Sequence, residues 1–246
     1  MREKPFPWIK LSALAGLLSA ICWAIGDILI VGFEASPENY PAIMQTPLLQ
    51  DKDFAALMVT GGTARLAAGA LFGVFSVPLM FFALFHIYKL MESGGRRFAT
   101  LATAMLFLGF AWSPMAHAAF FYFAEAVKAA LSVDVTSADR VFAMAKSFSD
   151  VLYIVYIPAV GMTAIGWVLV SIAMLRKKTL FPRWFGLITP FPASVFCILV
   201  VPLLPETLST PLGGAGFNLG GIIFYTASCI FCFAKSGHFQ ENQRSD

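Results

Sequence analysis

Six long apolar runs divide the chain, and each is long enough to cross a lipid bilayer as a helix. The hydrocarbon core of a bilayer is about 30 Å thick, which requires roughly 20 consecutive apolar residues in a helix. Hydrophobic residues make up 59% of the chain and charged residues 13%, and the mean hydropathy is +0.76. A water-soluble protein of this size is therefore excluded. The runs are Leu11–Phe33, Thr63–Met91, Thr100–Val127, Ser149–Leu175, Phe185–Leu204 and Asn218–Lys235.

The runs predict an all-α fold. Only helices and closed barrels satisfy the backbone hydrogen bonds of a chain in lipid, and these runs lack the two-residue alternation of barrel strands. We therefore expect one domain over residues 1–246, a bundle of six transmembrane helices. Prolines inside the runs remove backbone donors and predict bends that open space within the bundle. They are Pro78, Pro114, Pro158, Pro190, Pro192 and Pro202.

The basic residues predict the orientation. If the N-terminus is cytoplasmic, 12 of the 17 Lys and Arg residues fall on the inner face and the other five on the outer face. Lys and Arg are retained on the cytoplasmic side during insertion, so both termini are expected to be cytoplasmic. This topology explains the net charge of +3, and no nucleic-acid partner is expected. The inner group is Arg2, Lys4, Lys10, Lys89, Arg96, Arg97, Arg176, Lys177, Lys178, Arg183, Lys235 and Arg244, and the outer group is Lys52, Arg65, Lys128, Arg140 and Lys146.

Two connectors on the outer side are longer than a minimal turn. Within residues 34–62, three prolines precede a more helical stretch over Asp51–Val59. Within residues 128–148, Ser137 is a candidate N-cap, so the fourth helix is expected to begin before its apolar run and stand above the membrane. Because the longer connectors lie on the outer face, any ligand entrance is expected there.

Polar residues at membrane depth predict a binding pocket. An ionisable side chain in the hydrocarbon core is costly, so its presence indicates a functional site. At 1.5 Å per residue, Asp27 lies about 24 Å from Leu11 and His117 about 25 Å from Thr100, which places both at one level in the outer half. Other polar residues gather near this level and predict a pocket open to the outside. The candidate ligand-binding residues are Asp27, Arg65, His117, Tyr122, Glu125, Asp150, Tyr153 and Asn218.

Each candidate also has a structural interpretation. His117 is equally consistent with a neutral core histidine bonded to a carbonyl that Pro114 frees. Gly69 and Gly73 form a G-x-x-x-G spacing, which favours close helix packing within the bundle or between the subunits of a homo-oligomer. The alternative pairs are Asp27 with Arg65, Lys146 with Asp150, and Glu125 with Lys128.

No metal or cofactor is expected. The chain has three histidines, and His86 lies near the cytoplasmic boundary, too far in depth from His117 to share an ion. His86 is interpreted as an interfacial anchor, with a ligand or proton-relay role as the alternative. A metal held by His117 with Asp27 stays a minor alternative. Cys229 and Cys232 form a C-x-x-C inside the last run, where packing is the favoured interpretation.

Four short motifs carry a resemblance to a known family. The sequence resembles a bacterial family of small multi-span membrane proteins without assigned function. The resemblance implies a bacterial inner-membrane protein and carries no activity with it. The motifs are Gly26-Asp27-Ile28-Leu29, Phe85-His86-Ile87-Tyr88, Pro114-Met115-Ala116-His117 and Pro182-Arg183-Trp184.

Three functions are compatible with this pattern. The first is binding or transport of a small polar or amphiphilic molecule in the outer pocket, with membrane lipid around the protein. The second is an intramembrane enzyme that uses Asp27 and His117 as an acid–base pair on a lipid-like substrate. The third is a structural or accessory subunit, for which a solid bundle with Asp27 paired to Arg65 is expected.

Overall fold

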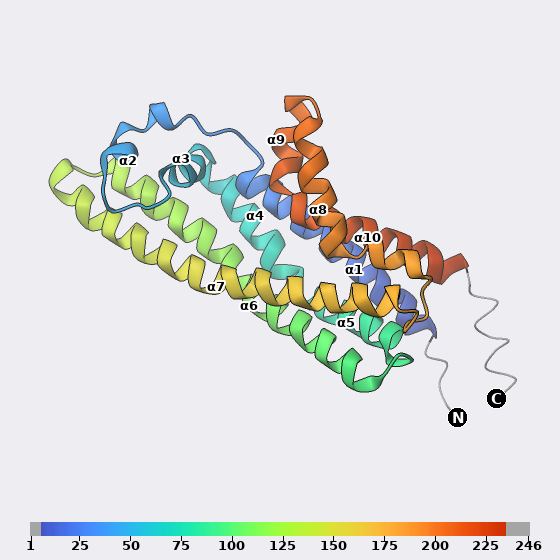
Figure 1. Cartoon of the computed structure of the whole chain (residues 1–246). Coiled ribbons are helices and arrows are strands. Elements are labelled where there is room, and N and C mark those ends of the chain that lie inside the picture. The colour runs from blue at the N-terminus through green and yellow to red at the C-terminus, as the bar shows by residue number, and fades with distance from the viewer. Residues whose placement is uncertain (1–5, 235–246) are drawn as a thin grey trace, which may run out of the picture.

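The chain folds into helices joined by short loops, and the described residues contain no strand (Figure 1). The computed structural model describes residues 6–234. Within this range the all-α prediction is confirmed. Arg2, Lys4 and Arg244, and Lys235 at the end of the last run, lie outside the described residues.

Five helical segments are long and apolar enough to cross a membrane. The second segment is interrupted at Ser76. A new helix begins at Val77, and Pro78 occupies its second position. The third and fourth helices continue through Pro114 and Pro158. The helices are α1 (Phe6–Val31), α4 (Thr63–Phe75) followed by α5 (Val77–Glu92), α6 (Arg96–Ser132), α7 (Val135–Leu175) and α10 (Gly216–Ala234).

The expected fifth span does not form one long helix. Its apolar helical part covers Pro190–Leu203, about 21 Å at 1.5 Å per residue, which is shorter than the hydrocarbon core. Pro190 occupies the first position of a helix, and Pro202 lies in a 3₁₀ turn, so prolines mark both ends of the short segment. The elements are η2 (Arg183–Leu187), α8 (Pro190–Val200), η3 (Val201–Leu203) and α9 (Glu206–Gly214).

The connector between α1 and α4 contains the helix that the sequence predicts. Asp51 is its N-cap and accepts a hydrogen bond from the backbone N–H of Phe54 at 2.9 Å. The prediction of a helical Asp51–Val59 stretch is therefore confirmed. The elements of this connector are η1 (Pro37–Asn39), α2 (Pro41–Gln45) and α3 (Lys52–Thr60).

Helix α7 begins well before its apolar run, as predicted, but its N-cap is Asp134 rather than Ser137. Hydrogen bonds from the hydroxyl of Thr136, and then from Ser137, hold the pKa of Asp134 below its usual value. A carboxylate accepts these bonds more strongly than a hydroxyl would, so the earlier acidic residue takes the capping position. At 41 residues, α7 is about 62 Å long, which is roughly twice the thickness of a hydrocarbon core.

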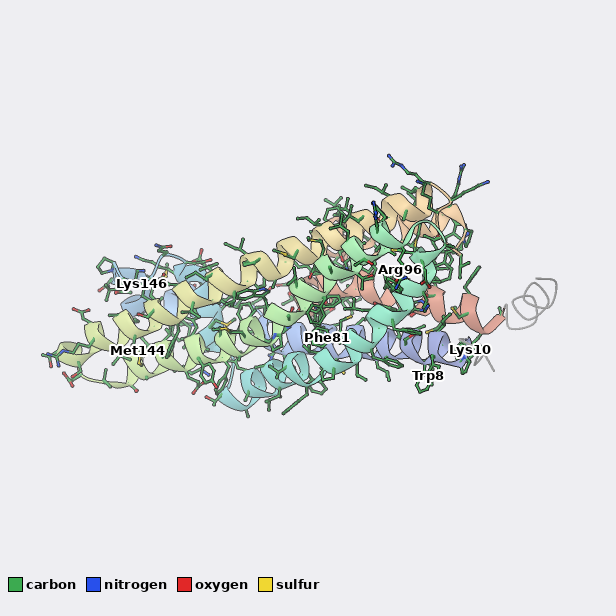
Figure 2. All side chains as sticks on the ribbon, turned by 90° about the horizontal axis from the view of Figure 1, so that it is seen from below. Trp8, Lys10, Phe81, Arg96, Met144 and Lys146 are labelled. Carbon is green, nitrogen blue, oxygen red and sulfur yellow. The ribbon has the colours of Figure 1, made fainter. Side chains whose placement is uncertain are left out.

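The helices enclose two apolar cores. One core lies toward the end of the bundle where α1 begins, and it includes Leu84, Phe110 and Phe224. The other lies at the opposite end, where α3 packs on the α6–α7 hairpin, and it includes Met58 and Phe123. Figure 2 shows these ends, with Trp8, Lys10 and Arg96 toward one and Met144 and Lys146 toward the other.

His86 is completely buried, so its interpretation as an interfacial anchor is wrong. Its Nδ1 lies 3.2 Å from the carbonyl oxygen of Ile9, and its Nε2 lies 2.6 Å from the hydroxyl of Ser228. A carbonyl can only accept, so Nδ1 donates and Nε2 accepts from Ser228 in a neutral ring. These two bonds join α5 to α1 and α10, which explains why the ring lies inside the bundle.

Glycines allow α1 and α4 to pack closely. A Cβ atom on Gly26 would lie 2.9 Å from the carbonyl oxygen of Gly69, and one on Gly69 would lie 2.8 Å from that of Gly26. Neither helix therefore has room for a larger residue at this contact. The close packing expected from the Gly69–Gly73 spacing is present within the chain.

We expect Gly26→Ala to destabilise the fold by about 1–3 kcal/mol, because the new methyl group must displace the backbone of α4. Gly161→Ala is the matched control, since beyond the neighbouring backbone of its own helix no atom lies within 4 Å of the added carbon. In the control, alanine should be neutral or slightly stabilising in a helix. Thermal unfolding of the purified variants measures both effects, and equal midpoints for the two variants would contradict the role of the contact.

Candidate ligand-binding cavity

A cavity of about 530 Å³ lies between α1, α6, α7, α8 and α10. On α7 the lining residues recur every three or four positions from Leu152 to Trp167, so one face of this helix forms a wall. These 15 residue steps correspond to about 22 Å at 1.5 Å per residue, so the cavity is elongated along α7.

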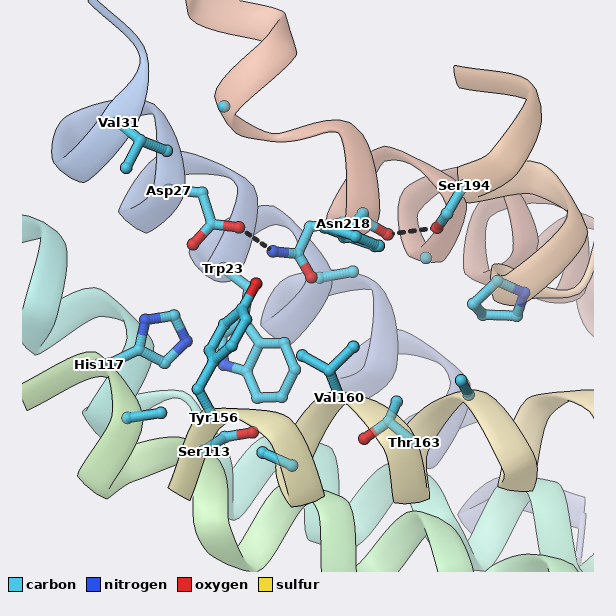
Figure 3. A pocket seen from close by; sticks show the side chains of 18 of the residues that line it. Trp23, Asp27, Val31, Ser113, His117, Tyr156, Val160, Thr163, Ser194 and Asn218 are labelled. Carbon is cyan, nitrogen blue, oxygen red and sulfur yellow. Dashed lines mark hydrogen bonds between the residues drawn. The ribbon is translucent and has the colours of Figure 1, made fainter. Parts of the chain in front are cut away.

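Asp27 and Asn218 form the polar end of the cavity (Figure 3). The Asn218 amide Nδ2 donates a hydrogen bond of 2.6 Å to Oδ2 of Asp27, which joins α10 to α1. The structure shows no hydrogen bond to the other carboxylate oxygen within residues 6–234. Tyr156 lines the cavity from α7. One carboxylate oxygen is thus held in place while the other stays available.

His117 enters the cavity from α6 and is 9% exposed. Its ring centroid lies 5.8 Å from that of Trp23, and the ring occupies the space above Gly73. Nδ1 of His117 is buried without a hydrogen-bond partner, so the expected bond to a carbonyl freed by Pro114 is not formed. The structure shows no hydrogen bond between His117 and Asp27. A buried imidazole nitrogen without a partner costs free energy unless a ligand or water reaches it.

Trp23 is fixed at the same level by α4. Its Nε1 donates to the carbonyl oxygen of Gly73 at 3.2 Å, and its ring packs edge-on against Phe110 with centroids 5.5 Å apart. Because Nε1 is hydrogen-bonded to α4, the part of the indole ring that lines the cavity is apolar. Trp167 of α7 and Tyr225 of α10 line the other end of the cavity.

The cavity has a mouth between α7 and α8. Phe191, Val195 and Ile198 of α8 line the cavity and are still 41%, 44% and 42% exposed. Helix α8 packs mainly on α10 and touches α7 little. The exposed residues on this side of the bundle are apolar, so the mouth opens toward the region that membrane lipid would fill.

Arg65 lies outside the cavity and does not pair with Asp27. Its guanidinium donates to the carbonyl oxygens of Leu29 at 3.0 Å and Ile28 at 2.9 Å, and lies 4.1 Å from the centre of the Phe33 ring. The last carbonyls of a helix have no partner within that helix. Arg65 therefore caps the end of α1, and the proposed clamp with Asp27 is not formed.

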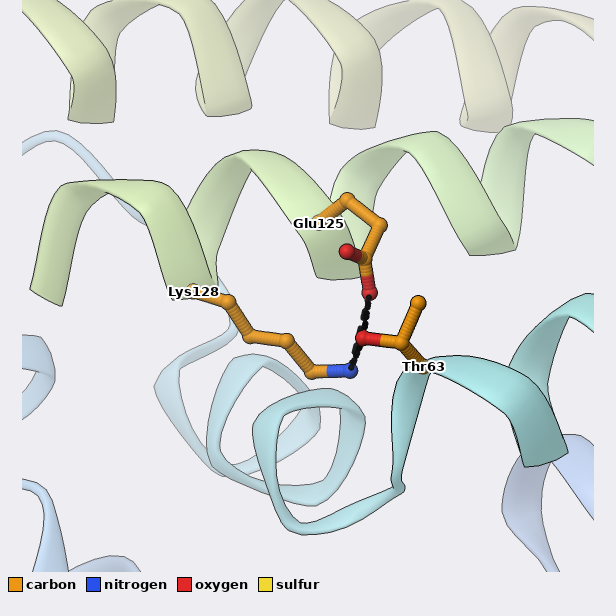
Figure 4. Close-up of polar contacts among 3 residues, drawn as sticks. All are labelled: Thr63, Glu125 and Lys128. Carbon is orange, nitrogen blue, oxygen red and sulfur yellow. Dashed lines mark hydrogen bonds and ion pairs between the residues drawn. The ribbon is translucent and has the colours of Figure 1, made fainter. Parts of the chain in front are cut away.

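The other polar candidates divide into two groups. Glu125 Oε1 accepts from Lys128 Nζ at 2.9 Å and from the hydroxyl of Thr63 at 2.9 Å, outside the cavity (Figure 4). Asp150 pairs with Lys146 at 2.6 Å, and the Tyr122 side chain is 56% exposed. Four of the eight candidates line the cavity, namely Asp27, His117, Tyr153 and Asn218, and four do not, namely Arg65, Tyr122, Glu125 and Asp150.

Sequence reasoning missed several polar residues of the cavity. Tyr156 follows Tyr153 by three positions on α7, so the helical spacing was a signal that both side chains share one face. Ser113 precedes His117 by four positions on α6 for the same reason. Thr163 and Ser194 carry no comparable signal. Among the described residues, no three His, Cys, Asp or Glu side chains are grouped so that they could hold a metal ion.

The Asp27–Asn218 bond should contribute about 1.5–3 kcal/mol to stability, because its acceptor is a carboxylate in partly buried surroundings. A double-mutant cycle with Asp27→Leu and Asn218→Leu, followed by chemical denaturation, isolates the coupling. We expect Asn218→Leu to destabilise the wild type but to cost much less in the Asp27→Leu background. Additive effects of the two substitutions would mean that the bond contributes nothing to stability.

Comparison with known proteins identifies the family but no activity. No curated protein and no solved structure matches the chain. The model of a family of unknown function, DUF6796, matches residues 1–235. This range contains every residue of the cavity and nearly the whole chain. The chain therefore belongs to the DUF6796 family.

Proposed function

We propose that this chain is a multi-pass protein of the bacterial inner membrane that binds or transports an amphiphilic small molecule. The observation that carries the proposal is the cavity, which has hydrogen-bonding groups at one end and a long apolar wall beyond them. Its volume of about 530 Å³ lies within the range of roughly 300–1,000 Å³ that is usual for sites of drug-sized ligands. Membrane lipid and this small molecule are the proposed partners.

The proposed topology has six crossings and both termini in the cytoplasm. Lys10 Nζ lies 4.9 Å from the centre of the Phe233 ring, so the start of α1 and the end of α10 are neighbours. The backbone N–H of Leu180 donates to the carbonyl oxygen of Leu90 at 3.2 Å, which joins the basic connector after α7 to the end of α5. In this proposal α8, η3 and α9 together form the remaining crossing, since Gly214 of α9 packs beside Gly32 at the far end of α1. The clustered Lys and Arg residues support a cytoplasmic position for this side.

An amphiphile fits the cavity better than a small polar molecule does. Most of the lining is apolar, and the polar groups gather near Asp27 and Asn218. A molecule dissolved in the bilayer would meet the mouth between α7 and α8 directly. Its polar head would reach Asp27, and its apolar part would lie along α7 toward Trp167.

The other two functions have less support in the geometry. An acid–base enzyme needs Asp27 and His117 within hydrogen-bond reach, directly or through one water. Asp27 bonds to Asn218, and no hydrogen bond links it to His117 in the described part of the chain. A purely structural subunit was expected to pair Asp27 with Arg65 in a solid bundle. Arg65 caps α1 instead, and the bundle contains the cavity.

Cysteine labelling tests the topology. In a variant with all four native cysteines replaced, we expect a membrane-impermeant maleimide to label Arg140→Cys in intact spheroplasts. Lys177→Cys should react only after the membrane is disrupted, because it belongs to the basic connector after α7. Labelling of both positions from one side would contradict the proposed arrangement of α7.

A substitution that fills the cavity should block ligand binding. Ala164 lines the cavity, whereas its neighbour Ile165 is 53% exposed on the outside of α7. Equilibrium dialysis of the neutral probe N-phenyl-1-naphthylamine, with the full chain in dodecyl maltoside micelles, measures binding against protein-free micelles. We expect saturable binding by the wild type and Ile165→Trp, and a loss of about tenfold or more in affinity for Ala164→Trp. Equal binding by all three, or none by the wild type, would contradict the proposed function.

A further inference from the structure

We infer that the ligand is an organic cation, an amine or quaternary ammonium amphiphile whose charged head binds at Asp27. The inference rests on the proposed function, because it names the chemical class of the molecule that occupies the same cavity. It follows from the charges that line the cavity, the unused carboxylate oxygen at its polar end and the aromatic rings that line it.

The cavity contains one carboxylate and no Lys or Arg side chain to neutralise it. Asp27 is the only Asp or Glu among the lining residues, and His117 is the only histidine. Arg65, the counter-ion that the sequence suggested, has its guanidinium engaged with carbonyl oxygens at the end of α1. An ionised carboxylate in apolar surroundings requires an opposite charge or strong donors. A cationic ligand supplies both.

The unused oxygen of Asp27 favours a ligand that brings positive charge. Asn218 satisfies one oxygen of Asp27, which fixes the carboxylate in position. The other oxygen accepts no hydrogen bond from the residues that the structure describes, and Asp27 lines the cavity. A carboxylate oxygen can only accept, so an ammonium N–H has an acceptor available there. The amide of Asn218 acts here as a positioning group for Asp27.

Aromatic rings line the cavity together with the carboxylate. Trp23 precedes Asp27 by one turn of α1, and Trp23 and Tyr156 both line the cavity (Figure 3). Phe120 also lines the cavity, and its ring centroid lies 5.8 Å from that of Tyr156. The faces of aromatic rings attract organic cations, and a cage of such rings with a carboxylate is suited to a quaternary ammonium group. An anionic head, such as a phosphate, would meet Asp27 with no cation to offset the repulsion.

Three probes of similar shape and different charge test the inference. Tetraphenylphosphonium is a cation, triphenylphosphine oxide is neutral and tetraphenylborate is an anion. Equilibrium dialysis with the full chain in dodecyl maltoside micelles measures each affinity against protein-free micelles. We expect the wild type to bind the cation on the order of 10- to 100-fold more tightly than the neutral probe, as for a partly buried charge pair. Tetraphenylborate should not bind saturably.

Asp27→Asn is the decisive variant, because asparagine keeps the size of the side chain and removes its charge. It should lose the preference for the cation and keep the affinity for the neutral probe. Glu125→Gln, the same change outside the cavity, is the control and should keep the preference. If Asp27→Asn does not fold, Asp27→Glu is the second variant and should keep the preference as well.

Equal affinities for the cation and the neutral probe in the wild type would overturn the inference, as would an unchanged preference in Asp27→Asn. In both cases the neutral probe still occupies the cavity, so the proposed function stands. Failure of the proposed function is a different result, in which no probe binds above the blank or Ala164→Trp binds all of them as the wild type does.

Discussion

The close contact between α1, α4 and α6 determines the position of the groups at the polar end of the cavity. Gly26 and Gly69 let the backbones of α1 and α4 touch, and Gly73 leaves the space that the His117 ring fills. The same contact brings the carbonyl oxygen of Gly73 within 3.2 Å of Trp23 Nε1. In lipid, helix association depends on close packing and interhelical hydrogen bonds rather than on the hydrophobic effect. The small residues at this contact therefore hold the side chains of Trp23 and His117 at the same depth in the bundle.

The end of α1 shows how charge is distributed around this contact. The carbonyl oxygens of a helix terminus need donors, and Arg65 supplies them from α4. Because the Arg65 guanidinium donates to these carbonyl oxygens, Asp27, one turn earlier on α1, accepts a hydrogen bond only from the neutral amide of Asn218. Arg65, which the sequence suggested as a partner for Asp27, thus leaves this carboxyl group available to the cavity.

The sequence predicts depth along a helix well but not direction around it. Counting residues placed Asp27 and His117 at one level, and both line the cavity. Glu125 and Asp150 lie toward the same end of α6 and α7 as the polar candidates of the cavity but do not line it, since packing decides which face is inward. Tyr156 was overlooked although it shares a face with Tyr153. For the same reason hydropathy found the Phe185–Leu204 run without showing that it divides into η2, α8 and η3, where Pro190 and Pro202 control the local structure.

The unpaired atoms in the cavity link stability to binding. Nδ1 of His117 is buried without a partner, which costs free energy in the folded protein, whereas the second oxygen of Asp27 stays open to the cavity. The apolar contacts of the two cores must offset this cost for the bundle to fold. Under the proposed function, a ligand that donates to the open oxygen of Asp27 stabilises the folded state by an amount that grows with the logarithm of its concentration relative to its Kd. A purely apolar molecule would contact the apolar wall without satisfying this oxygen, so the polar end would favour molecules that carry a donor.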